Sequence, residues 1–457
     1  MLDWRYLEPR KGKYYWRSLE RVVKMLNAEK IGISACLYEP PNWAQIHESR
    51  YVVRPEDFER FGEAIARKFR DRIAAYEIYN ELPTGSKWPQ IAVRSTRVYA
   101  PIQKAAYRGI KRGDPKAIVL MTGLWQFPQY FLEDMYRDGC KDYFDAVNVH
   151  YYLGGDRNPK YPDAFRGDLE TVLKQIDYVT KKYGDGDKPI WFTEYGWPAT
   201  AESQSAPVGE EKMAEYMEYF LTTCMDSGLV EKAFWYVYYL SDGMALWHER
   251  KDYKRPAFYV HTRFMEDFPD WRKLPVKPLH YPAPAANAVE VPGGDFEDDS
   301  AWTYGKDVKA TFEEADPQSG KRYLHLVAEK PDTLVTGEPF ALEPDKAYEL
   351  TGYVRMQGGM KNARYAHAMI HIDLLDGRKR PLELRGPLHG KKGELSTNYY
   401  ISDTGGKWYQ VHYNIYTTPA TRFGRIIVRL GHKDAPRGAA DFDNIQVKSL
   451  DLGKYDR

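Results

Sequence analysis

The sequence is poor in cysteine and has no excess of charge of either sign. Its 457 residues contain three cysteines, which lie far apart and form no CxxC pair. An odd, scattered set argues against a disulfide scaffold and a zinc ribbon. Lys and Arg number 66 and Asp and Glu number 65, which gives a net charge of +1. This balance excludes the basic footprint of a nucleic-acid-binding protein.

Long hydrophobic runs are missing as well. No apolar stretch approaches the roughly 20 residues that a membrane-spanning helix needs, so we expect no membrane span. The start, Met1-Leu2-Asp3-Trp4-Arg5, lacks the apolar segment of a signal peptide. As written, the chain is therefore expected to stay in the cytoplasm.

Aromatic residues, in contrast, make up 15% of the chain, with 37 tyrosines and 12 tryptophans. Their rings combine a flat apolar face with a polar edge, which suits the C–H faces and hydroxyl rims of sugars. Large α/β and all-β cores also use many aromatic residues, so composition leaves both interpretations open.

The first 270 residues alternate short apolar runs with longer helical patterns. Repeated strand–helix units over this length predict a parallel β/α barrel of the TIM type, with polar and aromatic residues at the strand ends where active sites lie. The clearest helical stripes span about residues 55–70 and 209–227. Six runs read as parallel strands buried on both faces: residues 31–37, 74–79, 118–122, 144–149, 189–193 and 233–239.

The pattern changes after residue 270. Four prolines interrupt residues 271–286, and no helical or strand period is present there. Further on, residues 365–374 and 408–416 alternate apolar and polar side chains, which is typical of an antiparallel β-sandwich. We therefore predict a barrel over residues 1–270, a linker over 271–290 and a sandwich over 291–457.

Two glutamates stand at the ends of predicted strands. Glu81 comes soon after the run 74–79, and Glu194 directly follows the run 189–193. Hydrolysis of a glycosidic bond needs two carboxyl groups, about 5 Å apart for retention of configuration and roughly 6.5–9.5 Å apart for inversion. A single glutamate after a strand could equally form a salt bridge or cap a helix. Two of them, each beside aromatic residues, favour a glycosidase pair.

The same residues resemble those of clan A glycoside hydrolases over about residues 3–268. In that clan an Asn-Glu after the fourth strand supplies the acid/base and a Glu after the seventh is the nucleophile, which matches Asn80-Glu81 and Glu194. The details are closest to family 39 and to endoglycosidases that cleave bacterial exopolysaccharides. The resemblance implies that the pKa of Glu81 is raised and that Glu194 stays ionised.

The resemblance also implies several sugar-binding residues. His150 and Tyr152 match the pair after the sixth strand of the clan, and Trp235 resembles the tryptophan that floors the site. Tyr152 would hydrogen-bond the nucleophile and keep it ionised. Each of these residues could instead belong to the barrel core or rim. Three loop aromatics are further candidates for outer sugar subsites: Trp43, Trp197 and Trp247.

A complete barrel has eight strand–helix units, whereas six strands are predicted here. Nothing before Asp3 can supply the first strand, the first helix and the second strand, nor the arginine that the clan places beneath the nucleophile. We therefore expect a barrel that lacks its first strands. Self-association could cover the open edge. A lost N-terminus would also account for the missing signal peptide, so the full-length protein is expected to be extracellular or periplasmic.

The last region resembles jelly-roll carbohydrate-binding modules of families 4, 9 and 22. In those modules the two chain ends meet around a structural calcium, and the resemblance implies Asp295, Glu297 and Asp443 as its ligands. Five residues of the predicted sandwich could bind a glycan or pack on the barrel: Tyr365, His367, His371, Gln410 and His412.

These observations predict a retaining β-glycoside hydrolase that acts within a β-linked polysaccharide or oligosaccharide and needs no cofactor for catalysis. The alternative is a non-catalytic polysaccharide-binding or scaffold protein derived from such an enzyme, which the missing strands favour. Turnover of an aryl glycoside separates the two interpretations.

Overall fold

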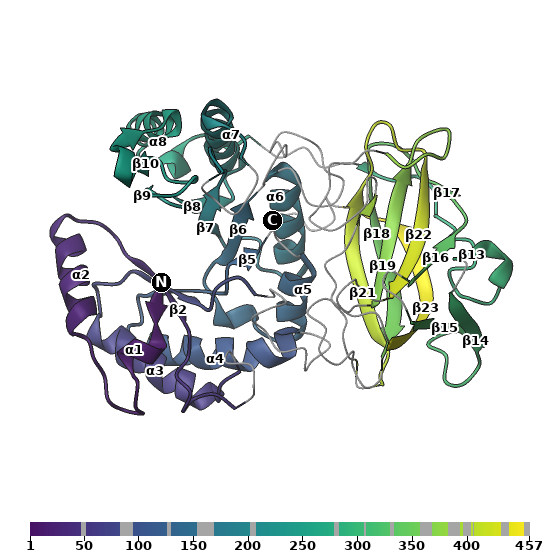
Figure 1. The fold of residues 1–457 in the computed structure, drawn as a ribbon, viewed down its shortest axis with the longest axis horizontal. Coiled ribbons are helices and arrows are strands. Elements are labelled where there is room, and N and C mark those ends of the chain that lie inside the picture. Colours follow the sequence, from purple (N-terminus) through teal and green to yellow (C-terminus); the bar gives the residue numbers. More distant parts are fainter. Residues whose placement is uncertain are drawn as a thin grey trace. The chain divides into compact units, whose positions relative to one another are not determined.

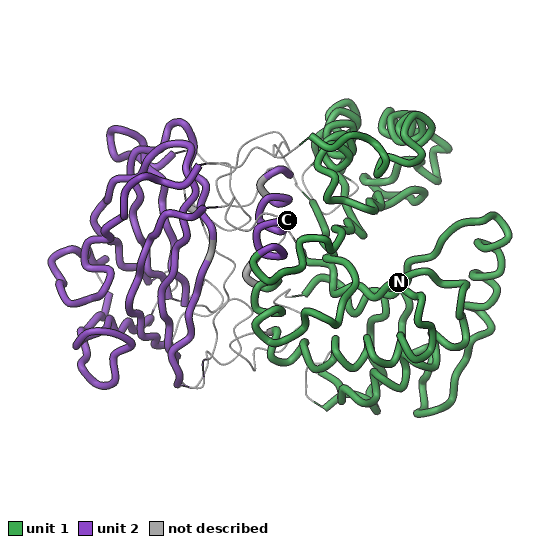
Figure 2. The backbone as a smooth tube through the Cα atoms, turned by 180° about the vertical axis from the view of Figure 1, so that it is seen from behind, with its two compact units in different colours: residues 1–89, 95–159, 182–278 green, residues 90–94, 160–181, 279–457 purple. Residues whose placement is uncertain are grey.

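The structure is a computed structural model, and Figure 1 shows its helices and strands. The chain divides into two compact units: residues 1–89, 95–159 and 182–278, and residues 90–94, 160–181 and 279–457 (Figure 2). The structure describes residues 1–46, 52–82, 95–125, 129–152, 169–201, 207–277, 283–305, 308–329, 333–356, 368–382, 394–395, 404, 406–430 and 438–451.

The first unit is built on two parallel sheets. Their strand orders are β1-β2-β3-β4 and β5-β6-β7-β8, and a bridge from Leu120 to Ala146 links the two. Within each sheet, a helix lies in the chain between successive strands, which is the connection that parallel pairing requires; one of these helices, α6, falls mostly in the residues of the second unit. The strands are β1 (Leu2–Asp3), β2 (Ser34–Tyr38), β3 (Ala75–Ile78), β4 (Ile118–Leu120), β5 (Leu124–Trp125), β6 (Val147–Tyr152), β7 (Ile190–Gly196) and β8 (Val230–Trp235).

The helices begin and end where the sequence supplies suitable residues. The α3 helix starts at Pro55, has Glu56 and Asp57 in its first turn and has basic residues in its last turn, which suits the helix dipole. The α7 helix ends at Gly228, whose φ of 66° is left-handed. The helices are α1 (Trp4–Leu7), α2 (Arg17–Ala28), α3 (Pro55–Lys68), α4 (Ser95–Gly113), α5 (Gln129–Arg137), α6 (Leu169–Lys182), α7 (Glu210–Ser227) and α8 (Pro256–Asp267).

Short elements complete the first unit. After β8, a small sheet has the order β11-β10-β9. Its strands are β9 (Tyr239–Leu240), β10 (Trp247–His248) and β11 (Tyr253–Lys254), and three 3-10 turns span Lys141–Tyr143, Glu249–Lys251 and Trp271–Lys273.

The predicted count of six parallel strands was wrong. Leu2 and Asp3 form β1, which pairs in parallel with β2, and the run 118–122 is divided between β4 and β5. A two-residue strand is too short to show any periodicity, so only pairing reveals it. The series ends at β1 and β8, and among the described residues no pairing joins these two strands into a closed barrel. Along β8, Phe234 is 38% exposed, as expected for an outer strand.

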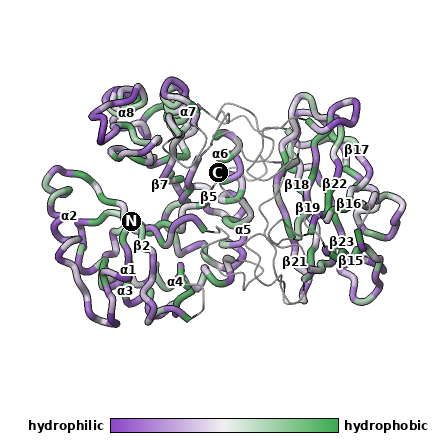
Figure 3. Tube along the Cα trace, viewed as in Figure 1, coloured by the Kyte–Doolittle hydropathy of each residue, from purple (hydrophilic) through white to green (hydrophobic). Residues whose placement is uncertain are grey.

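The second unit contains two mainly antiparallel sheets. One has the order β12-β18-β23-β15-β14, with β21 paired to β18; the other has the order β13-β16-β22-β19-β20, with β17 paired to β22. The two sheets pack closely at Gly352 of β18. A Cβ atom at this position would lie only 2.5 Å from the side chain of Ile370 in β19, which belongs to the other sheet. Both hydrophobic and hydrophilic residues occur along the tube of this unit (Figure 3).

The strands of this unit are β12 (Ala283–Pro284), β13 (Trp302–Tyr304), β14 (Lys309–Glu313), β15 (Tyr323–Ala328), β16 (Thr333–Gly337), β17 (Phe340–Ala341), β18 (Lys346–Arg355), β19 (Ala368–Leu375), β20 (Glu394–Leu395), β21 (Tyr409–Tyr416), β22 (Phe423–Leu430) and β23 (Gly438–Ser449). A 3-10 turn spans Asp299–Ala301.

The predicted glycan-binding face is only partly described. Tyr365 and His367 lie outside the described residues, and Gln410 is half-buried. His371 and His412 are 1% and 3% exposed, so these two side chains do not lie on an open surface. None of the described helices is long and apolar enough to cross a membrane.

Candidate active site

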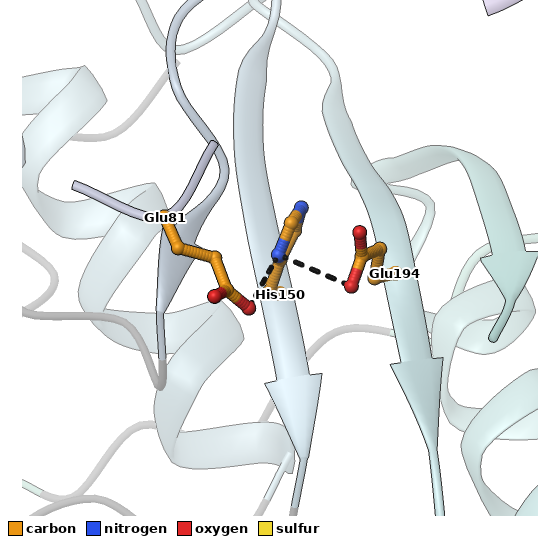
Figure 4. A group of neighbouring side chains, drawn as sticks. All are labelled: Glu81, His150 and Glu194. Atoms are coloured by element: carbon orange, nitrogen blue, oxygen red, sulfur yellow. Dashed lines mark hydrogen bonds and ion pairs between the residues drawn. The ribbon is translucent and has the colours of Figure 1, made fainter. Parts of the chain in front are cut away.

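Glu81, His150 and Glu194 come together at the ends of β3, β6 and β7. His150 lies between the two carboxylates, as Figure 4 shows. Its Nδ1 is 3.1 Å from Oε1 of Glu81 and 3.6 Å from Oε2 of Glu194. One atom from each of the three groups lies within 4.8 Å of the others. The two glutamates, 113 positions apart by their numbers, therefore share one histidine.

An irregularity in β7 brings two consecutive side chains to His150. The pairing with β6 runs Val149 to Phe192 and then His150 to Glu194, so Thr193 is the extra residue of a bulge. Without it, alternation would turn Thr193 and Glu194 to opposite faces. Instead Thr193 Oγ1 lies 3.0 Å from Nε2 of His150 while Glu194 faces Nδ1. Bulges commonly re-aim side chains in this way beside active sites.

The turn after β3 carries Glu81. Tyr79 and Glu81 have φ angles of 65° and 55°, in the left-handed region that non-glycine residues seldom adopt. Tyr79 is fully buried, and its ring contacts Phe58 edge-to-face at 5.4 Å. Asn80 is half-buried between them. Packing of Tyr79 therefore holds a turn conformation that Glu81 itself does not favour.

The environment of His150 favours its protonated form. Its side chain is fully buried, which by itself lowers the pKa. Hydrogen bonding to Glu77 and Glu81 and the charge of Glu194 outweigh burial and raise the pKa of His150 to about 10. A metal ion would have to displace this proton to use Nδ1 as a ligand.

Glu194 is held by donors from two sides. Tyr152 donates a hydrogen bond from its hydroxyl to Oε2 of Glu194 at 2.6 Å, as the sequence led us to expect. Burial raises the pKa of Glu194, whereas the charge of His150 and the Tyr152 hydrogen bond lower it, and the net direction is upward. The prediction that Glu194 stays ionised is a separate matter, because the direction alone does not fix its charge at neutral pH. The cause of the upward direction is burial, which the sequence does not show.

Sequence reasoning missed Glu77, Asn148 and Gly123. Glu77 is 4% exposed in β3 and lies 3.6 Å from Nε2 of His150. Gly123 must be glycine, because a Cβ atom there would lie 2.1 Å from that same nitrogen. A charged residue inside an apolar strand is the signal that could have revealed Glu77.

Of the predicted aromatic residues, Trp197 does not line a subsite. Its side chain is 0% exposed, and its ring lies 6.0 Å from that of Trp235 and 6.1 Å from that of Phe220. It is a core residue because β7 continues to Gly196, so that its ring packs inward instead of lying in a loop. Trp235 is half-buried and donates from Nε1 to the carbonyl oxygen of Met244 at 2.9 Å.

Trp43 and Trp247 are half-buried, and each has its indole N–H occupied. Trp43 donates to the carbonyl oxygen of Glu8 at 3.0 Å, and Trp247 donates to Oδ1 of Asp252 at 2.9 Å. Both keep part of a ring exposed, and their role as sugar subsites stays a prediction.

The carboxylates predicted to bind calcium accept backbone hydrogen bonds. Oε1 of Glu297 accepts from the N–H groups of residues 321–322, and Oδ2 of Asp443 accepts from those of residues 318–319. Asp295 accepts the N–H of Glu297 at 3.2 Å. In the part of the chain that the structure describes, these three carboxylates do not gather their oxygens at one point. The calcium site at these residues stays a prediction.

Comparison with known families adds to this geometry. Residues 89–251 match the family described as glycosyl hydrolase catalytic core. The match identifies this part of the chain as the core of a glycosidase. It includes His150, Tyr152 and Glu194, whereas Glu81 lies just before it. No curated protein matches the chain.

Solved structures also resemble parts of the chain. Xylanase 10B from Thermotoga maritima is 14% identical with a TM-score of 0.42, over 58% of this chain and 84% of that one. GH5_18 from Streptomyces cattleya, in complex with GlcNAc, is 14% identical with a TM-score of 0.45, over 61% and 72%. The CBM22-1 xylan-binding domain from Paenibacillus barcinonensis Xyn10C is 16% identical with a TM-score of 0.27, over 36% and 99%.

Proposed function

We propose that this chain is a retaining β-glycoside hydrolase that cleaves within a β-linked polysaccharide, with Glu81 as the acid/base and Glu194 as the nucleophile. The observation that carries the proposal is the approach of the two carboxylates, which have oxygens within 4.8 Å of each other. Retaining enzymes hold their carboxyl groups about 5–5.5 Å apart, whereas inverting enzymes leave a wider gap for water.

The proposed reaction has two displacements. In the first, an oxygen of Glu194 bonds to the anomeric carbon while the bond to the leaving oxygen breaks and Glu81 gives that oxygen its proton. In the second, water bonds to the anomeric carbon, its proton passes to Glu81, and the ester bond to Glu194 breaks. Both glutamates return to their starting states.

Several finer features belong to the same proposal. The half-buried rings of Trp43, Trp235 and Trp247 suit the faces of a sugar chain, and the exopolysaccharide-cleaving endoglycosidases of clan A remain the best match of motifs. We also propose that the second unit is a jelly-roll carbohydrate-binding module and that the protein acts outside the cytoplasm. Self-association over an open barrel edge stays a prediction.

Paired alanine variants test the assignment. Glu81→Ala should retain far more turnover on an aryl glycoside with a good leaving group than on a polysaccharide, because such a leaving group needs no proton. Added azide should then give a product of retained configuration. Glu194→Ala should lose turnover on both substrates, and added azide should give a product of inverted configuration. If the two variants behaved the other way round, Glu194 would be the acid/base and Glu81 the nucleophile.

Glu20→Ala is the matched control, because Glu20 is a half-exposed carboxylate of α2 that pairs with Lys68. Its turnover should equal that of the wild type. No turnover by the wild type on any glycan or aryl glycoside would overturn the proposal and favour a polysaccharide-binding protein. The observation that supports this alternative is that, among the described residues, β1 and β8 each pair along one edge only.

A further inference from the structure

A third buried carboxylate lies behind the catalytic pair. Glu77 is 4% exposed, and its Oε1 accepts the N–H of Gly123 at 2.9 Å. The same oxygen lies 3.6 Å from Nε2 of His150, on the side of the ring away from Glu81 and Glu194. The reaction proposed above uses the latter two glutamates and leaves Glu77 without a task.

Hydrogen bonds on the Glu77 side fix the proton on one ring nitrogen. Asn148 donates from its amide nitrogen to the carbonyl oxygen of Met121 at 3.2 Å, which leaves its Oδ1 as an acceptor. That oxygen receives both the backbone N–H and the hydroxyl of Thr193, at 3.3 and 2.8 Å. The Thr193 oxygen can then only accept from His150, so Nε2 carries a proton in either charge state.

The other nitrogen, Nδ1, is therefore the one that titrates. A neutral His150 would turn the lone pair of Nδ1 toward two carboxylates, whereas a protonated His150 turns an N–H toward them. Glu77 acts on this equilibrium from the opposite side of the ring, where it is 4% exposed, because an anion close to a buried ring favours the cation. Titratable groups that interact with the ring or with its three carboxylate partners come from five strands and their ends: Cys36, Glu77, Glu81, Tyr152, Glu194 and Tyr236.

We propose that Glu77 is a positioning residue whose negative charge keeps both nitrogens of His150 protonated, so that His150 is a fixed cation shared by Glu81 and Glu194. This inference rests on the function proposed above. In the first displacement negative charge leaves Glu194, which becomes an ester, and moves to Glu81, which has lost its proton. A cation 3.1 and 3.6 Å from the two carboxylates can compensate either one without moving.

Glu77 also prevents a competing proton transfer. If His150 gave its Nδ1 proton to the leaving group or to Glu81, the site would lose its counter-charge as the next step began. The nearby charge of Glu77 makes this loss unfavourable. The donor of the first displacement thus stays Glu81.

The test measures the protonation of His150 directly by NMR of histidine labelled with carbon-13, with His150→Gln to assign its signal. Wild-type His150 should titrate with a pKa of about 10. Glu77→Gln keeps the shape of the side chain and removes the charge, so the pKa of His150 should fall by about 1 to 3. An unchanged midpoint would overturn the proposal.

The matched control is Glu133→Gln, which removes another buried carboxylate, one that pairs with Lys182 and Arg137 of the same unit. It should leave the His150 midpoint in place even if it lowers stability. If Glu77→Gln does not fold, Glu77→Asp replaces it. The shorter side chain moves the charge away, so the midpoint should fall part of the way, and a wild-type midpoint in this variant would also overturn the proposal.

Kinetics give a second readout. In Glu77→Gln the alkaline limb of the kcat/KM profile should move to lower pH with little change in KM, because the counter-charge is lost earlier. A residue with only a structural role would lower the rate at every pH and leave the limbs in place. The NMR result does not depend on turnover, so a failure of the proposed function would not be mistaken for a failure of this inference.

Discussion

Carboxylates are buried in both units, but their partners differ. In the first unit, Glu77 and Glu194 surround a titratable histidine. In the second unit, the carboxylate of Asp443 is fully buried and accepts three backbone N–H groups, those of residues 318, 319 and 444. Glu297 likewise accepts two backbone N–H groups of the same loop.

The difference separates chemical from structural carboxylates. Backbone N–H groups neither gain nor lose protons. A carboxylate that they surround therefore holds a loop in place and exchanges no proton with these partners. A carboxylate whose partners are His150 and Tyr152 can change charge together with them. The predictions below test this division, starting with the largest expected effect.

The Glu194→Gln variant should lose at least about 10⁴-fold in kcat, because the amide cannot attack the anomeric carbon. Its stability should stay the same or rise. Burial raises the pKa of Glu194, which means that the fold disfavours the charge that glutamine removes. Stopped assays on an aryl glycoside and thermal unfolding measure the two effects. A clear loss of stability would place Glu194 with the structural carboxylates.

The stability of the first unit should depend on pH through His150. Its pKa is about 10 in the fold, against 6.5 for an unperturbed histidine. A raised pKa contributes stability that is complete below about pH 6.5 and is lost as the pH rises through about 10. The loss should be on the order of a few kcal/mol. Denaturant unfolding between pH 6 and 10 should show a steeper decline for the wild type than for His150→Gln; parallel curves would contradict the assignment.

The Asp443→Asn variant should lower the free energy of unfolding of the second unit by about 1–3 kcal/mol. The amide nitrogen of asparagine would face a backbone N–H that now has an acceptor, for instance that of Ser319. Turnover should not change, and addition of a calcium chelator should not shift the wild-type unfolding curve. If a chelator lowers the stability of the wild type but not that of Asp443→Asn, the result would support the predicted calcium site.

The smallest expected effect is that of Tyr152→Phe, about tenfold in kcat/KM. The lost hydroxyl donates to Glu194 and lowers its pKa, so its removal should raise that pKa and move the acid limb of the profile to higher pH. Tyr6→Phe, at a tyrosine that is 74% exposed, is the control. An acid limb that stays in place would show that Tyr152 acts on substrate instead.

Much of the site could be predicted because each strand supplies its residues locally. An apolar run followed closely by a polar residue marks a strand end, and this pattern found Glu81 and Glu194 as well as His150 and Tyr152. The structure brings all four together. The sequence placed Glu194 after its strand, however, whereas it lies inside β7.

What escaped prediction depends on partners distant in sequence. The bulge at Thr193 exists only relative to β6, and β1 is recognisable only by its pairing with β2. Trp197 looked like a loop aromatic, yet it packs in the core. The proton on His150 depends on Glu77, which lies 73 positions earlier in the numbering.

The sequence by itself determined which chemical groups are present and where each strand delivers them, because side-chain period and strand ends are local properties. Tertiary structure decided which of these groups carry charge. Burial disfavours ions and short distances favour opposite pairs, and both act through space between residues that the chain keeps far apart. A carboxyl group therefore has different roles in the two places. At Asp443 it holds a loop through backbone hydrogen bonds, and at Glu77 it belongs to a network of charged groups.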